Sequence, residues 1–311
     1  MSAQTFGGLL PGGRDVNFSE IEVTLARLVR DGRRRKRPPA RALTATVVVV
    51  GKSERLAAAA DALEQLGEAA GVRAILISEG GHASPIARVT ENAIAIAGLS
   101  PKYLNNAVAA LRLSSLPAAV WWRGGAVDAL DDLADLADRF ILDAEQPDEA
   151  WARAPGLFER TALTDLRWAA LTRWRAALAH LFDMPQVRAG APSIRALHIE
   201  AADKPSARLF AGWLRSSLKW TSAVAIDIQS SSNASTPLEC VTLEGGGLSI
   251  ALDIKESRTC LEAVVKGVMA SARVVPLPEG TLAALIGEEL GVRTRDLAFE
   301  RALVAAREIS P

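Results

Sequence analysis

Two glycine-containing stretches of this 311-residue sequence carry residue types that could bind a phosphate or move a proton. Gly51-Lys52-Ser53 resembles the end of a P-loop, but that motif needs its first glycine at Thr46, inside an expected strand, so nucleotide hydrolysis is not expected. The helix capped by Ser53 could still hold an anion with its free N–H groups. Gly80-Gly81-His82-Ala83-Ser84 follows another strand, where doubly wound sheets bind ligands. His82 has no identifiable catalytic partner, so we expect an exposed loop histidine.

The other candidates for chemistry also favour a structural interpretation. Asp128, Asp131 and Asp135 share one face of an expected helix, which resembles a metal-binding pattern. No second helix offers a matching face, and carboxylates at a helix start favour its dipole, so we expect a solvated face. His180 and His198 lack metal-ligand spacing to another histidine or a cysteine and are expected to be packed or half-exposed. We therefore expect no catalytic residue, no metal and no cofactor, and we expect the chain not to be an enzyme.

The charge and composition are those of an ordinary folded protein. The 36 basic and 36 acidic residues balance, so the chain has no overall attraction to nucleic acid or to membranes. The first residues lack the features of a signal peptide, and no apolar run approaches the roughly 18–20 residues that span a bilayer. We therefore expect a cytoplasmic protein. Cys240 and Cys260 are expected to be reduced, mostly buried thiols.

Alternating strands and helices make up the first half of the chain. A short amphipathic helix over 17–29 precedes the basic segment Arg33–Arg37, which two prolines follow, so we expect an exposed linker there. Val47–Val50 is too continuous a β-branched run for a half-exposed strand, which predicts burial on both faces. The expected strands are 42–50, 72–78, 93–97, 118–122 and 139–142, and the expected helices are 53–70, 101–113 and 128–137. This alternation predicts a doubly wound, mostly parallel sheet with helices on both faces.

The second half of the chain has a different organisation. Residues 146–185 are expected to be helical, and 185–192, with its two prolines, to be a linker. Gly245–Gly247 is expected to supply a hairpin turn. The expected strands are 194–200, 223–229, 238–244, 248–254 and 260–265, the last with a helical alternative, and the expected helices are 205–218, 281–290 and 294–307. We therefore predict an α/β protein with four segments: an N-terminal helix and basic linker (1–40), a doubly wound domain (41–150), a tryptophan-rich helical junction (151–190) and a smaller C-terminal α+β domain (191–311).

Tryptophans gather in three places: Trp168 with Trp174, the pair Trp121-Trp122, and Trp213 with Trp220 at an expected helix end. Thr164 and Asp165 favour the start of a helix, on which five apolar residues share one stripe: Trp168, Leu171, Trp174, Leu178 and Leu181. The structural interpretation of this stripe is packing on the N-terminal sheet. The flanking Arg167, Arg173 and Arg175 are harder to bury and are better candidates for contact with a partner protein.

The second tryptophan group is the pair Trp121-Trp122 at the end of an expected strand. Adjacent residues of a strand point to opposite faces. One of the two is expected in the core, and the other either packs under a helix or lines the crevice at the strand end.

The same residues carry a resemblance to a known family. Asp165–Asp183, with both tryptophans and the three arginines, resembles the central signature of the OpcA family, the glucose-6-phosphate dehydrogenase assembly proteins. Leu116–Gly124 resembles the family's LPxxxWW stretch, and Ala211–Trp220 resembles its AGWL…LGW stretch. Arg usually stands where this chain has Ala170, and Pro where it has Arg173.

This resemblance implies an accessory protein, without catalysis of its own, that binds glucose-6-phosphate dehydrogenase and promotes its active oligomer in the pentose phosphate pathway. The expected partner-contact residues are Arg167, Trp168, Arg173, Trp174, Arg175, Trp121 and Trp122. Cysteines common in the family between the second and third strands are missing from Glu79–Asn92, so thiol control of the complex is in doubt for this chain.

Two alternatives remain open at this point. The chain could be a small-molecule-binding protein or an enzyme that holds a sugar phosphate or nucleotide in the crevice of the N-terminal sheet. The less favoured alternative is binding of nucleic acid through Arg33–Arg37.

Overall fold

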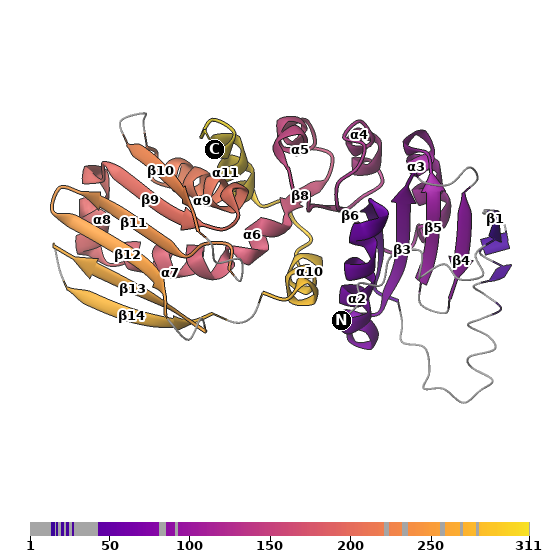
Figure 1. Ribbon diagram of the computed structural model, residues 1–311, viewed down its shortest axis with the longest axis horizontal. Helices are drawn as coiled ribbons and strands as arrows, with labels where there is room; N and C mark the ends of the chain where they lie inside the picture. Colours follow the sequence, from indigo (N-terminus) through magenta and orange to yellow (C-terminus); the bar gives the residue numbers. More distant parts are fainter. Residues whose placement is uncertain are drawn as a thin grey trace. The chain divides into compact units, whose positions relative to one another are not determined.

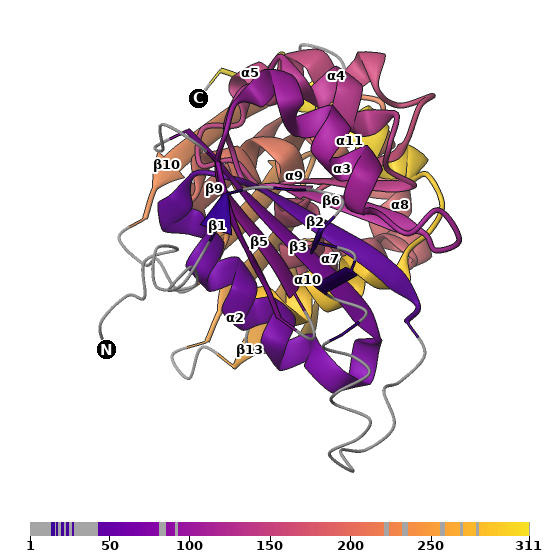
Figure 2. The ribbon, with the colours of Figure 1, turned by 90° about the vertical axis from the view of Figure 1, so that its right-hand side faces the viewer.

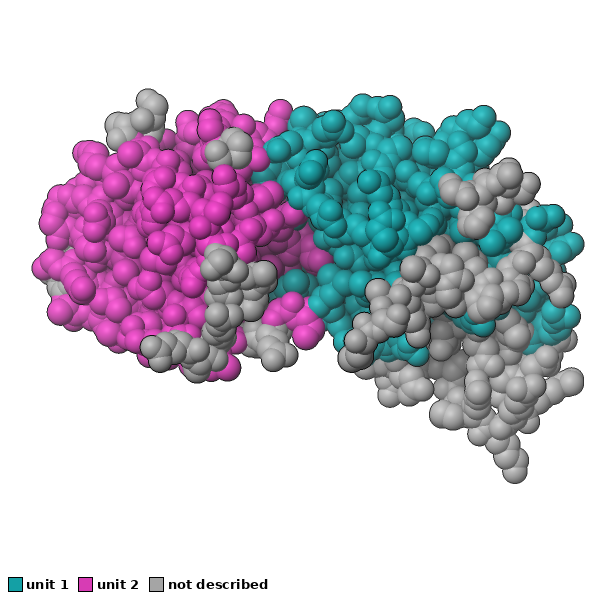
Figure 3. Space-filling model, viewed as in Figure 1, with its two compact units in different colours: residues 1–165, 282–295 teal, residues 166–281, 296–311 magenta. Residues whose placement is uncertain are grey.

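The computed structural model divides the chain into two compact units. It describes residues 14–15, 17, 20–21, 23–24, 27, 43–80, 85–90, 93–220, 224–231, 236–255, 259–267, 270–277 and 280–310. The first unit comprises Met1–Asp165 and Leu282–Arg295, and the second comprises Leu166–Thr281 and Asp296–Pro311 (Figure 3). The basic segment Arg33–Arg37 and the loop residue His82 lie outside the described residues. Within the expected helix over 17–29, Glu20 and Ile21 are helical, and Ile21 is buried.

The first unit is built on an eight-stranded sheet with the strand order β1-β4-β5-β3-β2-β6-β7-β8. Its strands are β1 Arg14–Asp15, β2 Ala45–Gly51, β3 Val72–Glu79, β4 Ile86–Val89, β5 Ala93–Leu99, β6 Ala118–Trp122, β7 Arg139–Leu142 and β8 Ala162–Asp165. β2 lies between β3 and β6 and runs parallel to both, so the order of the strands reverses at β2 and β6. The antiparallel pairings in the described part of this sheet are β1 with β4 and β4 with β5, both at one edge. The predicted doubly wound, mostly parallel sheet is confirmed.

Helices cover this sheet on two sides. They are α2 Ser53–Ala70, η2 Pro101–Tyr103, α3 Leu104–Leu111, α4 Ala129–Ala134, α5 Asp148–Arg153, η3 Ala154–Gly156 and α10 Leu282–Gly291. α3 contacts α4, while α2 contacts α10 (Figure 2). Because α10 packs on α2, the helix near the C-terminus that we expected in the C-terminal domain belongs to the first unit instead.

The strand β2 and the helix after it follow the sequence pattern closely. Val47–Val50 is fully buried, as its β-branched run predicts. α2 ends at Gly71 in the left-handed conformation, with φ of 60°, which glycine adopts without steric cost. The expectation that Ser53 caps the helix is wrong. Lys52 occupies the cap position, and the Ser53 hydroxyl instead lies 2.5 Å from the hydroxyl of Ser78 on the neighbouring strand.

The second unit is built on a six-stranded sheet with the order β10-β9-β11-β12-β13-β14. Its strands are β9 Ala196–Ala201, β10 Ala225–Ser230, β11 Cys240–Gly245, β12 Leu248–Ile254, β13 Cys260–Lys266 and β14 Ser271–Pro276. β10 is parallel to β9, and the other neighbouring strands are antiparallel. Gly246 and Gly247 form the predicted hairpin turn between β11 and β12, both with positive φ. The expected strand over 260–265 is confirmed as β13, and its helical alternative is wrong.

The helices of the second unit are α6 Leu166–Ala170, α7 Thr172–Phe182, α8 Pro185–Gly190, η4 Ala191–Ser193, α9 Lys204–Ser217 and α11 Leu297–Ala306. The expectation of a linker over 185–192 is wrong, because Pro185 begins α8 and Pro192 lies in η4. Proline at the first turn supports a helix, since the N–H it lacks would have no partner there.

Four strands were not expected: β1, β4, β8 and β14. The first three have only two to four residues each, too few for an alternation pattern to appear. β8 is fully buried and lies directly before α6, so its residues are easily assigned to the helical segment.

Candidate functional site

The tryptophan segment begins at the boundary between the two units. Asp165 ends β8 and the first unit, and Leu166 begins α6 and the second unit. The expected single helix from Thr164 is therefore a strand followed by two helices, which are separated at Leu171. The carboxylate of Asp165 is buried and accepts a hydrogen bond of 2.8 Å from the indole N–H of Trp151. This bond fixes the last residue of β8 inside the first unit.

Trp168 is held on three sides within the second unit. It is 3% exposed, and its indole N–H donates to Asp296 at 2.7 Å. The guanidinium carbon of Arg175 lies 3.5 Å from the centre of its ring, and Phe299 packs edge-on at 5.7 Å between ring centres. Asp296 also caps α11 by accepting hydrogen bonds from backbone N–H groups. Trp168 therefore joins α6 to the start of α11.

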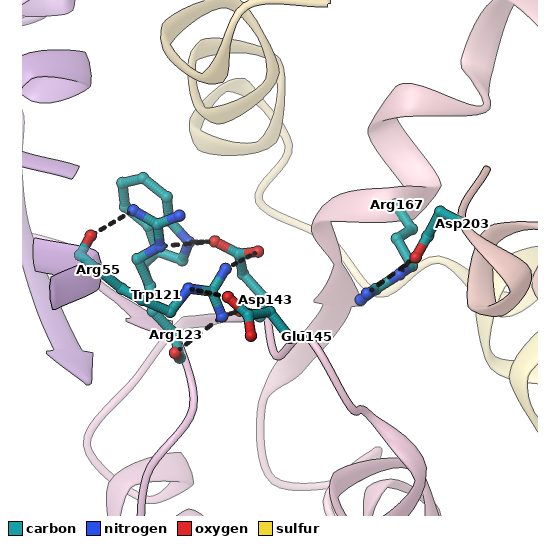
Figure 4. Close-up of polar contacts among 7 residues, drawn as sticks. All are labelled: Arg55, Trp121, Arg123, Asp143, Glu145, Arg167 and Asp203. Atoms are coloured by element: carbon teal, nitrogen blue, oxygen red, sulfur yellow. Dashed lines mark hydrogen bonds and ion pairs between the residues drawn. The ribbon is translucent and has the colours of Figure 1, made fainter. Parts of the chain in front are cut away.

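Arg167 and Arg175 are both used inside the second unit. The Arg167 guanidinium donates to Asp203, with Nε 2.7 Å from Oδ2 (Figure 4). Asp203 also caps α9 by accepting the N–H of Ser206 at 3.1 Å. Arg175 donates to the carbonyl of Trp168 at 3.1 Å while its charge lies over the indole ring. These two arginines therefore stabilise the segment that carries them.

Arg173 differs from the other arginines because its side chain is exposed on α7. Four further residues of α7 and its C-terminal end are exposed: Ala176, Ala179, His180 and Asp183. The apolar stripe lies on the other side of the helix, where Trp174 is fully buried. α7 packs on β13, so the stripe covers the sheet of the second unit and not, as we expected, the N-terminal sheet.

Trp121 and Trp122 lie in the core of the first unit, 0% and 2% exposed. The indole N–H of Trp121 donates to Asp143 at 3.1 Å, and the guanidinium of Arg123 lies 4.8 Å from the Trp121 ring centre. Of the seven expected contact residues, Arg173 alone is exposed.

The crevice expected at the carboxyl ends of β2 and β6 is occupied by the protein's own side chains (Figure 4). Arg123 follows β6 and donates to Asp143 at 2.7 Å and to the carbonyl of Arg55 at 2.7 Å. Arg55 in turn donates to the carbonyl of Asp143 at 2.6 Å. A Cβ on Gly51 would lie only 3.1 Å from the Cβ of Arg123, which shows how closely this side chain packs on the β2–α2 turn.

This network leaves the Gly51–Ser53 turn without the open loop that a phosphate needs. Burial lowers the pKa of Arg123, and the neighbouring Arg55 lowers it further, whereas Asp143 raises it. The Asp143 carboxylate accepts hydrogen bonds from Arg55, Arg123 and Trp121, so its contacts are those of a structural ion pair.

The acidic helix face is ion-paired. Arg153 contacts Asp128 and Asp131, and Arg160 contacts Asp131 and Asp135, so the carboxylates connect α4 to the end of α5 and to the segment that follows it. Among the described residues, no group of three or more His, Cys, Asp or Glu side chains is arranged to hold a metal ion.

The two cysteines are free and half-buried. Cys240 on β11 and Cys260 on β13 are separated by β12, which places their Cα atoms about 10 Å apart or more, beyond the roughly 7 Å limit of a disulfide. Burial and the carboxylate of Asp253 raise the pKa of the Cys240 thiol to about 12. A disulfide between these two cysteines of one chain is therefore not available in this fold.

The AGWL stretch is a helix-packing site. A Cβ on Gly212 would lie 2.3 Å from the carbonyl oxygen of Ala302 and 2.7 Å from the backbone nitrogen of Ala306. The absence of a side chain at Gly212 therefore allows α9 and α11 to approach closely. Trp213, the next residue, packs against Phe210 with ring centres 5.3 Å apart and ring planes tilted by 54°.

The residues that sequence reasoning missed are the carboxylates that position the tryptophan segment, Asp203 and Asp296. Both are helix caps, directly before α9 and α11. An aspartate immediately before an amphipathic helix is a recognisable signal for a cap. Its second role, as acceptor for Arg167 or Trp168, depends on contacts 36 and 128 residues apart in the chain.

Comparison with known proteins gives matches to one family. Residues 161–303 match the family model described as the C-terminal domain of the glucose-6-phosphate dehydrogenase subunit. A putative OxPP cycle protein OpcA from Synechocystis sp. is 28% identical over 127 residues, which cover 38% of this chain and 27% of that protein. A protein of the same name from Nostoc punctiforme is 30% identical over 122 residues, covering 36% of this chain and 26% of that protein. The matched stretches thus span only about a quarter of each relative.

Solved structures resemble the chain in fold. An oxidoreductase from Sinorhizobium meliloti has a TM-score of 0.52 and 9% sequence identity, covering 86% of this chain and 95% of that one. At this identity the likeness concerns the α/β fold alone. Among the described residues, the helices are too short or too polar for a membrane span.

Proposed function

We propose that this chain, which belongs to the OpcA family, is a non-catalytic accessory protein that binds and activates glucose-6-phosphate dehydrogenase. The family match over residues 161–303 contains the whole tryptophan segment, Asp165–Asp183. The two relatives are named for the oxidative pentose phosphate cycle, and the family model for a subunit of the dehydrogenase. These names support a role for this chain in the same pathway.

The observation that carries the proposal is the arrangement of the signature segment. Trp168 and Trp174 are buried, and Arg167 and Arg175 form hydrogen bonds within the second unit. The segment, which includes α7, is therefore held firmly in place. Within this segment, Arg173 on α7 is exposed to solvent. Arginine is enriched at the energetically important positions of protein interfaces, and a rigid surface loses little entropy on binding. We therefore assign Arg173 as the contact residue of this segment, and the tryptophans as its scaffold.

Activation follows if the chain binds one state of the dehydrogenase more tightly than the others. A partner that prefers the active oligomer raises the fraction of enzyme in that state by the ratio of its affinities for the two states. This mechanism needs no catalytic group in the accessory protein. The filled crevice around Arg123 and Asp143 supports the same interpretation and counts against a sugar-phosphate or nucleotide site at Gly51–Ser53.

The test is to mix the purified chain with the native dehydrogenase of the same organism. Native mass measurement and steady-state kinetics are expected to show a complex and a higher rate. Arg173→Glu is expected to weaken the complex about tenfold or more. Arg293→Glu, at another exposed arginine, is the matched control and is expected to bind like the unmodified chain. If neither a complex nor a change in rate is seen, the proposal is wrong.

A further inference from the structure

The six-stranded sheet of the second unit has one face packed on helices and one face turned outward. Residues along β9, β11, β12 and β13 alternate between buried and more exposed positions. The buried set packs against α9 and α7, which contact β9 and β13. Figure 1 shows the strands in front of these helices, so the outward set faces the viewer. A sheet face of this kind is available to a partner.

The strand register aligns the outward residues in three cross-strand rows. The first row is Asp227, His198, Thr242, Ala251, Val264 and Ala272. The second row is Gln229, Glu200, Cys240, Asp253, Glu262 and Val274. The third row is Ala225, Ala196, Glu244, Ser249 and Lys266. We call these seventeen residues the outer sheet face. Its centre, around Thr242, Ala251 and Val264, has short side chains, so a partner surface can approach the strands closely.

The charged residues of the outer sheet face are mostly acidic. Asp253 and Glu262 stand directly opposite each other on neighbouring strands, and Glu200 lies in the same row beyond Cys240. Like charges opposite each other destabilise a sheet, and the ion pair between Lys255 and Glu262 offsets part of this repulsion. Asp227 at the edge of the sheet and Glu244 in the third row add a fourth and a fifth carboxylate.

Three basic side chains, those of His198, Lys255 and Lys266, lie on or near this face and leave it acidic. His198 has Nδ1 2.8 Å from Asp227 and Nε2 3.3 Å from Glu200. Lys255, beyond the end of β12, forms an ion pair with Glu262. The five carboxylates therefore outnumber the three basic side chains, and the half-exposed Asp253 stands between Glu262 and Cys240 in its row.

The dimensions of the outer sheet face suit a protein partner. Six strands spaced at about 4.8 Å, each contributing about six residues at roughly 3.3 Å, make a patch of roughly 500 Å². This is more than half of the roughly 800 Å² that each partner buries in a standard interface. A second copy of the chain is not the expected occupant, because pairing two identical faces would bring their carboxylates together.

We propose that the outer sheet face binds a protein surface rich in lysine and arginine. The inference rests on the proposed function, which makes the dehydrogenase the partner, and it adds a second contact surface to the one at Arg173. Complementary charges steer such an encounter and fix its orientation, and the short central side chains allow close packing. The complex is therefore sensitive to salt, because added ions screen the attraction.

The experiment measures the affinity of the full chain for the native dehydrogenase at several salt concentrations. The charge variant is Glu200→Gln with Asp253→Asn and Glu262→Gln, which keeps side-chain size and removes the like-charged pair. The matched control is Glu54→Gln with Asp61→Asn and Glu64→Gln, at three exposed carboxylates of α2. A second variant, Ala251→Arg, places a long cationic side chain at the centre of the face.

We expect the charge variant and Ala251→Arg each to weaken binding about tenfold or more. The affinity of the charge variant is also expected to depend less on salt concentration than that of the unmodified chain. The control variant is expected to bind like the unmodified chain. If either face variant folds, by thermal unfolding, and binds as tightly as the unmodified chain, the outer sheet face is not the interface while the proposed function stands. If the unmodified chain forms no complex, the proposed function fails and this inference fails with it.

Discussion

Arg139 on β7 and Glu289 on α10 form a buried ion pair, although 150 residues separate them in the chain. The two side chains are only 7% and 4% exposed. Glu289 also accepts a hydrogen bond of 3.3 Å from the Thr164 hydroxyl, and Arg139 donates to the carbonyl of Thr294 at 3.3 Å. This pair fastens α10, which comes from the C-terminal part of the sequence, to the sheet of the first unit.

Removal of one partner of this pair is expected to be strongly destabilising. Glu289→Gln leaves the Arg139 charge buried without its counter-ion, which costs about 3–5 kcal/mol of unfolding free energy. Denaturant unfolding measures this loss. Glu288→Gln, at the exposed neighbouring position, is the control and should change stability by less than about 0.5 kcal/mol. Equal stability of the two variants would show that the ion pair does not hold α10.

The arginines of the tryptophan segment should separate into structural and exposed residues. Arg167→Ala removes the guanidinium from Asp203, and we expect a loss of about 1–2 kcal/mol. Arg173→Ala removes an exposed side chain and should change stability by less than about 0.5 kcal/mol. Thermal unfolding of both variants is the measurement. The assignment of roles is refuted if Arg173→Ala proves the less stable of the two.

Gly212 should not tolerate even a methyl group. Gly212→Ala places a Cβ 2.3 Å from the backbone of α11, so the two helices must separate, at an expected cost of about 1–3 kcal/mol. Gly156→Ala is the control, because a Cβ on Gly156 would have no described atom within 4 Å. Chemical unfolding of the two variants gives the comparison. A Gly212→Ala variant as stable as the Gly156→Ala variant would contradict the close approach of α9 and α11.

Lys219 is the residue at which a change should increase stability. It has a φ of 53°, a left-handed conformation that costs a non-glycine residue roughly 1 kcal/mol. Lys219→Gly is therefore expected to raise the unfolding free energy by about 0.5–1 kcal/mol. Ser217→Gly, at the exposed last residue of α9, should lower it, because glycine weakens a helix. Calorimetric melting temperatures distinguish an increase in stability from a decrease. A melting temperature of Lys219→Gly below that of the unmodified chain would show that the backbone at Lys219 is not strained.

Glu79 should make stability depend on pH. Burial raises its pKa above 4.5, although its hydrogen bond from the N–H of Ala126 lowers it. A raised folded-state pKa leaves stability unaffected below 4.5 and reduces it as pH rises through the folded value, because the ionised form is disfavoured in the fold. Glu79→Gln, which keeps an acceptor for Ala126, should be more stable than the unmodified chain at neutral pH and equal to it near pH 4. Unfolding curves measured across this range, with Glu64→Gln as an exposed control, test the prediction. A constant difference at all pH values would exclude the titration of Glu79 as its cause.

The sequence predicts the central elements well and the edges poorly. β6 and β7 occur at the expected residues, since each is a short apolar run bounded by turns. β4 and β8 have four residues each, and their strand conformation depends on neighbours far along the chain that provide hydrogen bonds. The two prolines of residues 185–192 predict a linker where α8 forms, because proline breaks the interior of a helix but supports its first turn.

The candidate site was predictable as a segment but not in its detail. Residue spacing alone identifies the buried stripe of Trp174, and the resemblance identifies the family. The direction of each arginine could not be predicted, because Arg167, Arg173 and Arg175 lie close together in the sequence and carry the same charge. The difference between them is set by Asp203 and by the ring of Trp168.

Local pattern in the sequence thus determines the alternation of strands and helices, the buried valines of β2 and the presence of a tryptophan-rich segment. These features depend on periodicity and side-chain type, which a short window of residues contains. Tertiary structure decides that α10 joins the first unit through Glu289, that Arg123 fills the expected crevice, and that Arg173 is left exposed on α7. Each of these outcomes depends on which residues distant in the sequence come into contact and carry an opposite charge. These contacts exist only in the folded chain.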